Sequence, residues 1–147
     1  MPKPITPLVG ADLFVVNEKQ EVLLVKRSDN GFWCTPGGCQ NLGESVTQCA
    51  EREFFEETGY SARATQLLGV FSSSCYEYVN YPWIDNEFTH VLYKGEITGG
   101  SPKLSEETLE IAWFSKDNLP LLSDGHAPRL EYCFQFIDDS SIAPYFE

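Results

Sequence analysis

The sequence is poor in positive charge: 10 lysines and arginines stand against 22 aspartates and glutamates, and the formal net charge is −12. The positive residues are scattered, and their longest run is Lys26-Arg27. Long nucleic acids and anionic membranes are bound by clustered lysine and arginine, so neither is an expected partner. A small phosphorylated substrate stays compatible with the acid excess, because carboxylates can hold divalent cations that attract phosphate oxygens.

The chain also lacks the marks of a disulfide framework, a zinc site or a membrane segment. Its 5 cysteines form no Cys-x-x-Cys pair, and only 2 histidines are available as further zinc ligands. The apolar stretch Pro7 to Val16 does not resemble a signal peptide, because Asp12 interrupts it and Lys3 is the single positively charged residue before it. No segment approaches the roughly 20 apolar residues that span a bilayer. We therefore expect a cytoplasmic protein.

Length and apolar content predict a single globular domain over residues 1–147. Domains cluster at about 100–150 residues, and a chain of this size can bury roughly 68–70% of its unfolded surface. With 42% hydrophobic and 14% aromatic residues, the composition is too apolar for a disordered chain despite its charge.

Five segments rich in Val, Leu, Ile and Phe predict β-strands. The first two flank the polar residues Asn17 to Gln20, so we expect them to pair as an antiparallel hairpin. The segments are Leu8 to Val16, Glu21 to Val25, Ala62 to Phe71, Glu87 to Ile97 and Leu109 to Phe114.

Two helices are predicted from their start and stop signals. Ser45 and Gln48 form a capping box, and Gly59 stands where a C-cap glycine belongs, so the first helix spans Val46 to Thr58. The second runs from about His126 to Ile137. This order of elements favours an α+β fold in which a mixed sheet lies between helices.

Three glutamates on the first predicted helix form the most informative cluster. With about 100° per helical residue, Glu56 and Glu57 lie on either side of Glu53, within one sector about 100° wide. Adjacent like charges destabilise a helix, and hard divalent cations bound by carboxylate oxygens would compensate them. Arg52 can hold one carboxylate by a bidentate contact. The preceding Pro36-Gly37-Gly38 brings unshielded backbone close, where it can approach a metal or a phosphate.

Residues 38–60 resemble the signature of the Nudix hydrolase family. The signature is a glycine, five residues, a glutamate, seven residues and then Arg-Glu-hydrophobic-x-Glu-Glu-x-Gly-hydrophobic. It covers 23 of the 147 residues, and the order of the flanking elements resembles the Nudix fold, a mixed sheet between helices. Its fixed positions are filled by Gly38, Glu44, Arg52, Glu53, Phe54, Glu56, Glu57, Gly59 and Tyr60.

The resemblance implies cleavage of a pyrophosphate bond with the help of Mg²⁺ or Mn²⁺. Such ions would polarise phosphorus, neutralise developing charge and lower the pKa of a bound water. The metal ligands would be Glu53, Glu56 and Glu57, with the backbone carbonyl of Gly37 as an additional one. Arg52 would orient the carboxylates.

Further members of the implied site surround these ligands. Glu44 and Gly38 would lie near the metals without binding them. The segment Glu107-x-x-Glu110-x-x-Trp113 resembles a family pattern that often supplies one more acid, and we favour Glu107. The alternative is that Glu107 is simply a polar residue at the start of the following strand. Which acid acts as the general base varies within the family and stays open; the expected catalytic residues are Glu53, Glu57, Arg52 and Glu107.

Substrate contacts are expected from two places. Arg27 can bind a substrate phosphate or simply end its strand. The long loop Ser72 to Asn86 is rich in aromatic residues, which can stack on a base or cover the surface as a dimer contact. Tyrosine and proline in this region accompany different substrate preferences in the family, and both occur here, so the substrate stays open. The aromatic candidates are Tyr76, Tyr78, Tyr81 and Trp83.

The expected function is therefore a divalent-metal-dependent hydrolase of a nucleoside diphosphate linked to another moiety. ADP-ribose-like compounds, sugar nucleotides and dinucleoside polyphosphates all belong to this class. One alternative is a nucleoside triphosphate pyrophosphohydrolase that removes non-standard nucleotides. An alternative of another class is a Nudix domain that binds nucleotides without turnover. A monomer and a homodimer are both compatible with the sequence.

Overall fold

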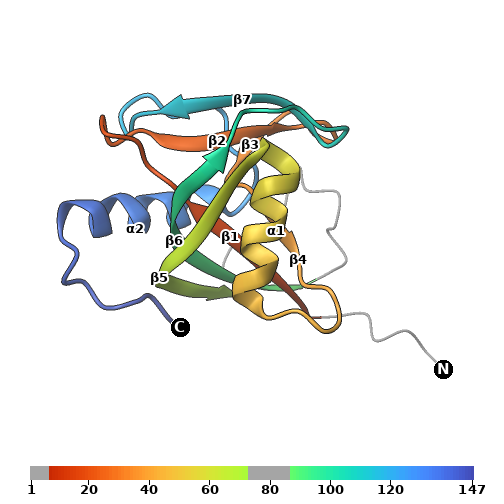
Figure 1. The fold of residues 1–147 in the computed structure, drawn as a ribbon. Helices are drawn as coiled ribbons and strands as arrows, with labels where there is room; N and C mark the ends of the chain where they lie inside the picture. The colour runs from red at the N-terminus through yellow and green to blue at the C-terminus, as the bar shows by residue number, and fades with distance from the viewer. Residues whose placement is uncertain (1–6, 73–86) are drawn as a thin grey trace.

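The computed structural model describes residues 7–72 and 87–147, which fold into two β-sheets and two helices (Figure 1). This arrangement confirms the predicted α+β class. No helix within these two ranges is long and apolar enough to cross a membrane. The elements are β1 (Leu8–Phe14), β2 (Val22–Arg27), β3 (Trp33–Cys34), β4 (Gly37–Cys39), α1 (Val46–Thr58), β5 (Tyr60–Ser72), β6 (Phe88–Gly100), β7 (Thr108–Phe114) and α2 (His126–Asp138).

The larger sheet is mixed and has the strand order β4-β1-β6-β5, while the smaller sheet has the order β3-β2-β7. β1 runs parallel to β6, and the other pairings of named strands are antiparallel. Helix α1 packs on one face of the larger sheet and α2 on the other (Figure 1). The predicted mixed sheet between helices is thus confirmed.

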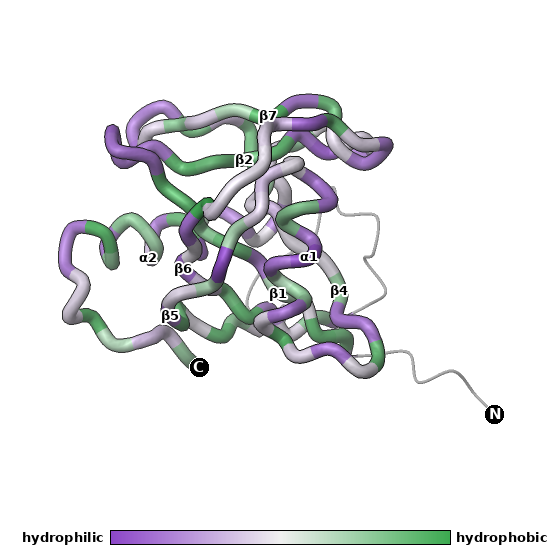
Figure 2. Tube along the Cα trace, in the orientation of Figure 1, coloured by the Kyte–Doolittle hydropathy of each residue, from purple (hydrophilic) through white to green (hydrophobic). Residues whose placement is uncertain are grey.

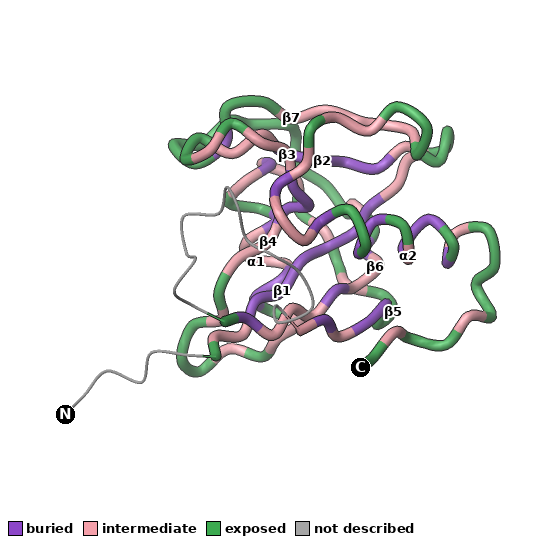
Figure 3. The backbone as a smooth tube through the Cα atoms, turned by 180° about the vertical axis from the view of Figure 1, so that it is seen from behind, coloured by how far each residue is buried: buried purple, intermediate pink, exposed green. Residues whose placement is uncertain are grey.

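The first two strands do not form the hairpin expected from the sequence. β1 and β2 lie in different sheets, and their antiparallel contact is limited to the end of the turn, where Val16 bridges Val22. Residues Gly10 to Phe14 of β1 are all buried, and β1 crosses the middle of the molecule in Figure 3. The backbone N–H and C=O groups of a strand this deeply buried need hydrogen-bond partners, which neighbours on both edges of the sheet supply. β6 and β4 take those positions.

Helix α1 has the boundaries that its caps predict. The Ser45 hydroxyl accepts a hydrogen bond from the Gln48 N–H at 3.1 Å, and the Gln48 side chain accepts one from the Ser45 N–H at 2.8 Å. Gly59 ends the helix with φ 80°, donating its N–H to the Phe55 carbonyl at 2.8 Å. A Cβ at Gly59 would lie 2.4 Å from the Ser101 carbonyl oxygen, so a larger residue does not fit there.

Two hydrophobic clusters fill the spaces beside the larger sheet. Ala11 and Leu13 face α1 and pack with Phe54, whereas Phe14 faces α2 and packs with Leu130. The apolar stretch of β2 contributes alternate residues to both clusters and is coloured as hydrophobic in Figure 2. The core therefore fixes α1 and α2 against opposite faces of one sheet, and β1 lies between them.

The short strands β3 and β4 were not predicted, because segments of two or three residues carry no periodicity and Pro36-Gly37-Gly38 looks like a breaker. β4 nevertheless pairs with β1 in a defined register, with Gly37 opposite Asp12 and Gly38 opposite Ala11. This register places the two glycines beside the glutamate-bearing face of α1.

Candidate active site

A cavity of about 380 Å³ opens where the two sheets, α1 and the start of α2 meet. Its volume lies within the usual range for small-molecule sites. Its lining includes residues of β1, β2, β3, β4, α1 and β6, together with the first residue of α2. The predicted site residues that line it are Arg27, Gly37, Gly38, Glu53, Glu57 and Glu107.

The two glycines of β4 are in close contact with the carboxylates of α1. A Cβ built on Gly38 would lie 2.4 Å from the carboxyl carbon of Glu53. The Gly37 N–H donates a hydrogen bond to Oε2 of Glu57 at 3.3 Å. Only a residue without a side chain at position 38 lets this strand approach the helix so closely, so the glycine that opens the sequence signature has a direct steric cause.

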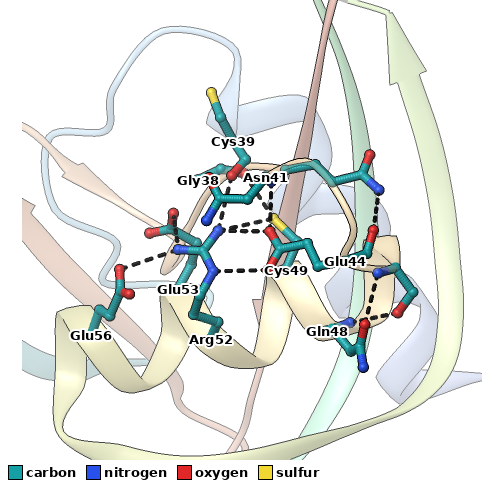
Figure 4. A network of polar contacts seen from close by, with 11 residues as sticks. Gly38, Cys39, Asn41, Glu44, Gln48, Cys49, Arg52, Glu53 and Glu56 are labelled. Carbon is teal, nitrogen blue, oxygen red and sulfur yellow. Dashed lines mark hydrogen bonds and ion pairs between the residues drawn. The ribbon is translucent and has the colours of Figure 1, made fainter.

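Arg52 is the centre of a polar network beside the cavity (Figure 4). Its Nε and Nη2 donate to the two carboxylate oxygens of Glu44 at 2.9 and 2.8 Å. Its Nη1 donates to Glu53 at 2.8 Å and to Glu56 at 3.3 Å. The hydrogen bonds from Arg52 and from the Asn41 backbone N–H lower the pKa of Glu44 to about 2. Glu44 therefore remains ionised and holds the guanidinium that orients Glu53.

Glu53 and Glu57 lie in surroundings that disfavour their ionised forms. Burial raises the pKa of Glu57 well above its usual value, and the charges of Glu53 and Asp12 raise it further. Burial also raises the pKa of Glu53, although Arg52 acts in the opposite direction. The cavity brings these carboxylates together with the glycine backbone of β4, and oxygen ligands of this kind suit a hard divalent cation.

The donor set is not fully assembled. Within residues 7–72 and 87–147, no three His, Cys, Asp or Glu side chains are grouped as a ready metal site. Glu56 does not line the cavity; its side chain is 55% exposed and contacts Arg52. Its role as a metal ligand stays a prediction. The groups at this site that could hold a cation are Glu53, Glu57 and backbone oxygen.

Glu107 and Arg27 approach the cavity from the smaller sheet. Glu107 precedes β7, and its charge is one cause of the raised pKa of Glu53. Glu110, three residues later, instead forms an ion pair with Lys26 at 3.1 Å and does not line the cavity. Arg27 forms two hydrogen bonds to the Asp29 carboxylate, at 2.8 and 2.5 Å. The structure thus separates the two acids of the Glu-x-x-Glu segment. The aromatic candidates Tyr76, Tyr78, Tyr81 and Trp83 lie outside the described residues.

The cavity also contains residues that sequence reasoning did not assign to the site. Asp12, Thr35, Phe88, His90 and His126 all line it. Burial is the main cause that lowers the pKa of His90 to about 2, so this imidazole is neutral at physiological pH. The sequence offered one indication that these residues belong to the site: Asp12 is a charged residue inside an otherwise apolar strand.

Comparisons with known proteins agree with this geometry. The NUDIX domain model matches residues 6–135. A candidate 8-oxo-dGTP diphosphatase of Bacillus subtilis is 39% identical over 113 residues, which are 76% of this chain and 69% of that protein. An ADP-ribose pyrophosphatase of Methanocaldococcus jannaschii is 31% identical, over 82% of this chain and 69% of its own length. The solved structure of an ADP-ribose pyrophosphatase from Streptococcus suis has a TM-score of 0.73 at 26% identity and covers 97% of each chain.

The family model covers most of the chain, and the match includes the helix, the glycines and the glutamates that surround the cavity. The sequence identity to these relatives and the shared fold identify the family. This identification does not depend on the substrate of any one relative. The chain therefore belongs to the Nudix hydrolase family and is an enzyme of the pyrophosphohydrolase type.

Proposed function

We propose that this protein hydrolyses a pyrophosphate bond in a nucleoside diphosphate linked to another moiety, with Mg²⁺ or Mn²⁺ as cofactor. The observation that carries the proposal is that Glu53, Glu57 and Glu107 line one cavity together with the glycine backbone of β4. Such a cavity offers oxygen ligands on one side and room for a small phosphorylated compound.

The proposal gives roles to acids of the cavity, to the Gly37 backbone and to Arg52 beside them. Glu53, Glu57 and the Gly37 carbonyl would hold the cation, which when bound supplies charge neutralisation at the phosphates and a more acidic water. Arg52 fixes the Glu53 carboxylate at 2.8 Å, and the Gly37 N–H orients Glu57. A carboxylate of the site accepts the proton of the attacking water, as the bridging oxygen leaves phosphorus with its electron pair. Glu53, Glu57 and Glu107 are the candidates for this base.

A second candidate function is hydrolysis of nucleoside triphosphates to monophosphates and pyrophosphate. The similarity to a candidate 8-oxo-dGTP diphosphatase, at 39% identity, favours it. The similarity to the ADP-ribose pyrophosphatase of Methanocaldococcus jannaschii favours the first candidate. Both reactions need the same carboxylates, so the catalytic residues are common to the two functions and only the substrate differs.

A substrate panel with Mg²⁺ or Mn²⁺ separates these functions. ADP-ribose, UDP-glucose, a dinucleoside polyphosphate, dGTP and 8-oxo-dGTP would be compared by kcat/KM, with products identified by mass spectrometry in ¹⁸O-labelled water. Preference for the diphosphate compounds supports the proposal, and preference for the triphosphates supports the second candidate. Binding without turnover of any compound at saturating metal would contradict both and leave a nucleotide-binding domain.

Variants of the acids then test the site. Glu53→Gln and Glu57→Gln should each lower kcat by about 10²–10⁴-fold, because each removes a charged oxygen ligand or a base. Glu107→Gln should also lower kcat, whereas the matched control Glu110→Gln should not, since Glu110 contacts Lys26 outside the cavity. Near-normal turnover in both Glu53→Gln and Glu57→Gln would overturn the metal assignment.

A further inference from the structure

A buried ion pair lies directly behind the β4 backbone. Arg129 Nη1 of α2 lies 3.4 Å from Oδ2 of Asp12 on β1, and the two side chains are only 3% and 10% exposed. Desolvation makes such a pair expensive, and a hydrophobic replacement is often equally stable, so fold stability alone does not explain it. The groups that Asp12 and Arg129 contact therefore indicate the function of this ion pair.

Asp12 contacts the segment that leads into β4. Its Oδ2 accepts a hydrogen bond from the Thr35 hydroxyl at 2.8 Å. Its Oδ1 occupies the space beside Gly37: a Cβ on that glycine would lie 1.9 Å from it. The carboxylate is thus packed against the Gly37 backbone, whose N–H donates to Glu57 on the side of the cavity. Asp12 and Glu57 contact the same peptide segment.

Arg129 is itself held in place by α2. Its Nε donates to the Gly125 carbonyl at 3.0 Å, and its Nη2 lies 3.2 Å from Nδ1 of His126. His126 also lines the cavity. Because α2 packs on the larger sheet through Leu130, the guanidinium has a fixed position relative to β1. The charge that balances Asp12 therefore comes from an element far away in the sequence.

We propose that Asp12, held by Thr35 and Arg129, is a positioning residue that fixes the Gly37 backbone for cation binding. In this proposal Asp12 acts through the Gly37 peptide and its neighbour Glu57. This inference rests on the proposed metal-dependent function. Groups that orient metal ligands typically change metal affinity by about 10–100-fold when removed.

Thr35→Val tests the proposal without changing any charge. The substitution keeps the size of the side chain and removes the hydroxyl that holds Asp12, whereas Thr35→Ser keeps the hydroxyl. We expect Thr35→Val to weaken Mn²⁺ binding by about 10-fold in calorimetry without substrate, and to lower kcat more than it changes KM. It should also speed hydrogen exchange of the Gly37 amide in the metal-free protein. Thr35→Ser should restore all three properties.

The matched control is Thr108→Val, which removes a buried hydroxyl that has no hydrogen-bond partner among the described residues. It should bind Mn²⁺ as the wild type does. Wild-type Mn²⁺ affinity and Gly37 exchange in Thr35→Val would overturn the positioning role, and Thr35→Ala repeats the test if the valine variant does not fold. Absence of Mn²⁺ binding and hydrolysis in the wild type would instead reject the proposed function.

Discussion

Adding one methyl group at Gly38 should disable catalysis while preserving the fold. In Gly38→Ala the new Cβ would lie 2.4 Å from the Glu53 carboxyl carbon and 2.5 and 2.7 Å from its oxygens. The nearest contact is about 1 Å too short for ordinary van der Waals packing, so the carboxylate must move by about that distance. Displacement of a catalytic group by about 1 Å can cost roughly 10²-fold in rate, or about 2.7 kcal/mol of transition-state stabilisation. Gly38 does not have a positive φ, so alanine introduces no backbone strain there.

The assay is initial-rate kinetics on the best compound of the substrate panel, with thermal unfolding as a check of the fold. Gly99→Ala is the matched control, because a Cβ at Gly99 meets no atom within 4 Å and its φ is not positive. This control should retain wild-type kcat. A kcat for Gly38→Ala within about threefold of the wild type would refute the reasoning, since the close packing of glycine and carboxylate would then have no catalytic consequence.

Two further predictions concern stability. The pKa of His90 is lowered to about 2 in the folded protein, so the unfolded chain binds a proton below pH 6.5 that the folded chain does not. The folded state therefore has its full stability above pH 6.5 and loses up to about 1.4 kcal/mol per pH unit as pH falls below that value. Denaturant unfolding of His90→Gln should show a smaller loss of stability at low pH. Parallel curves of stability against pH for the variant and the wild type would contradict the lowered pKa of His90. Gly59→Ala should lower the free energy of unfolding by more than about 1 kcal/mol, because alanine would adopt φ 80° and contact the Ser101 carbonyl at 2.4 Å. An unchanged melting temperature for Gly59→Ala would show that the helix ends differently.

Helix α1 could be predicted residue by residue because its signals are local. Ser45, Gln48 and Gly59 determine its ends through hydrogen bonds within a few residues of each other. The helical repeat then places Glu53 and Glu57 near one another whatever the rest of the chain does. The family resemblance rests on the same short segment, so the glutamates of the site could be predicted without knowledge of the fold.

The partners of β1 could not be predicted in the same way. The turn after β1 indicated a hairpin, but β1 pairs in parallel with β6, which places Gly10 opposite His90. That pairing depends on the packing of two helices against opposite faces of the sheet, which no local pattern encodes. For the same reason, the sequence did not assign Asp12 to the cavity or show that Glu56 lies outside it.

The parallel pairing of β1 with β6 has a consequence for the order in which the protein becomes active during synthesis. The chain must close a loop of about eighty residues before these strands meet, and such non-local contacts slow folding. The carboxylates of α1 exist as soon as the helix forms, but the cavity also needs β6 and residue 126 of α2. A nascent chain that carries the complete signature therefore still lacks the assembled site until α2 has emerged and docked.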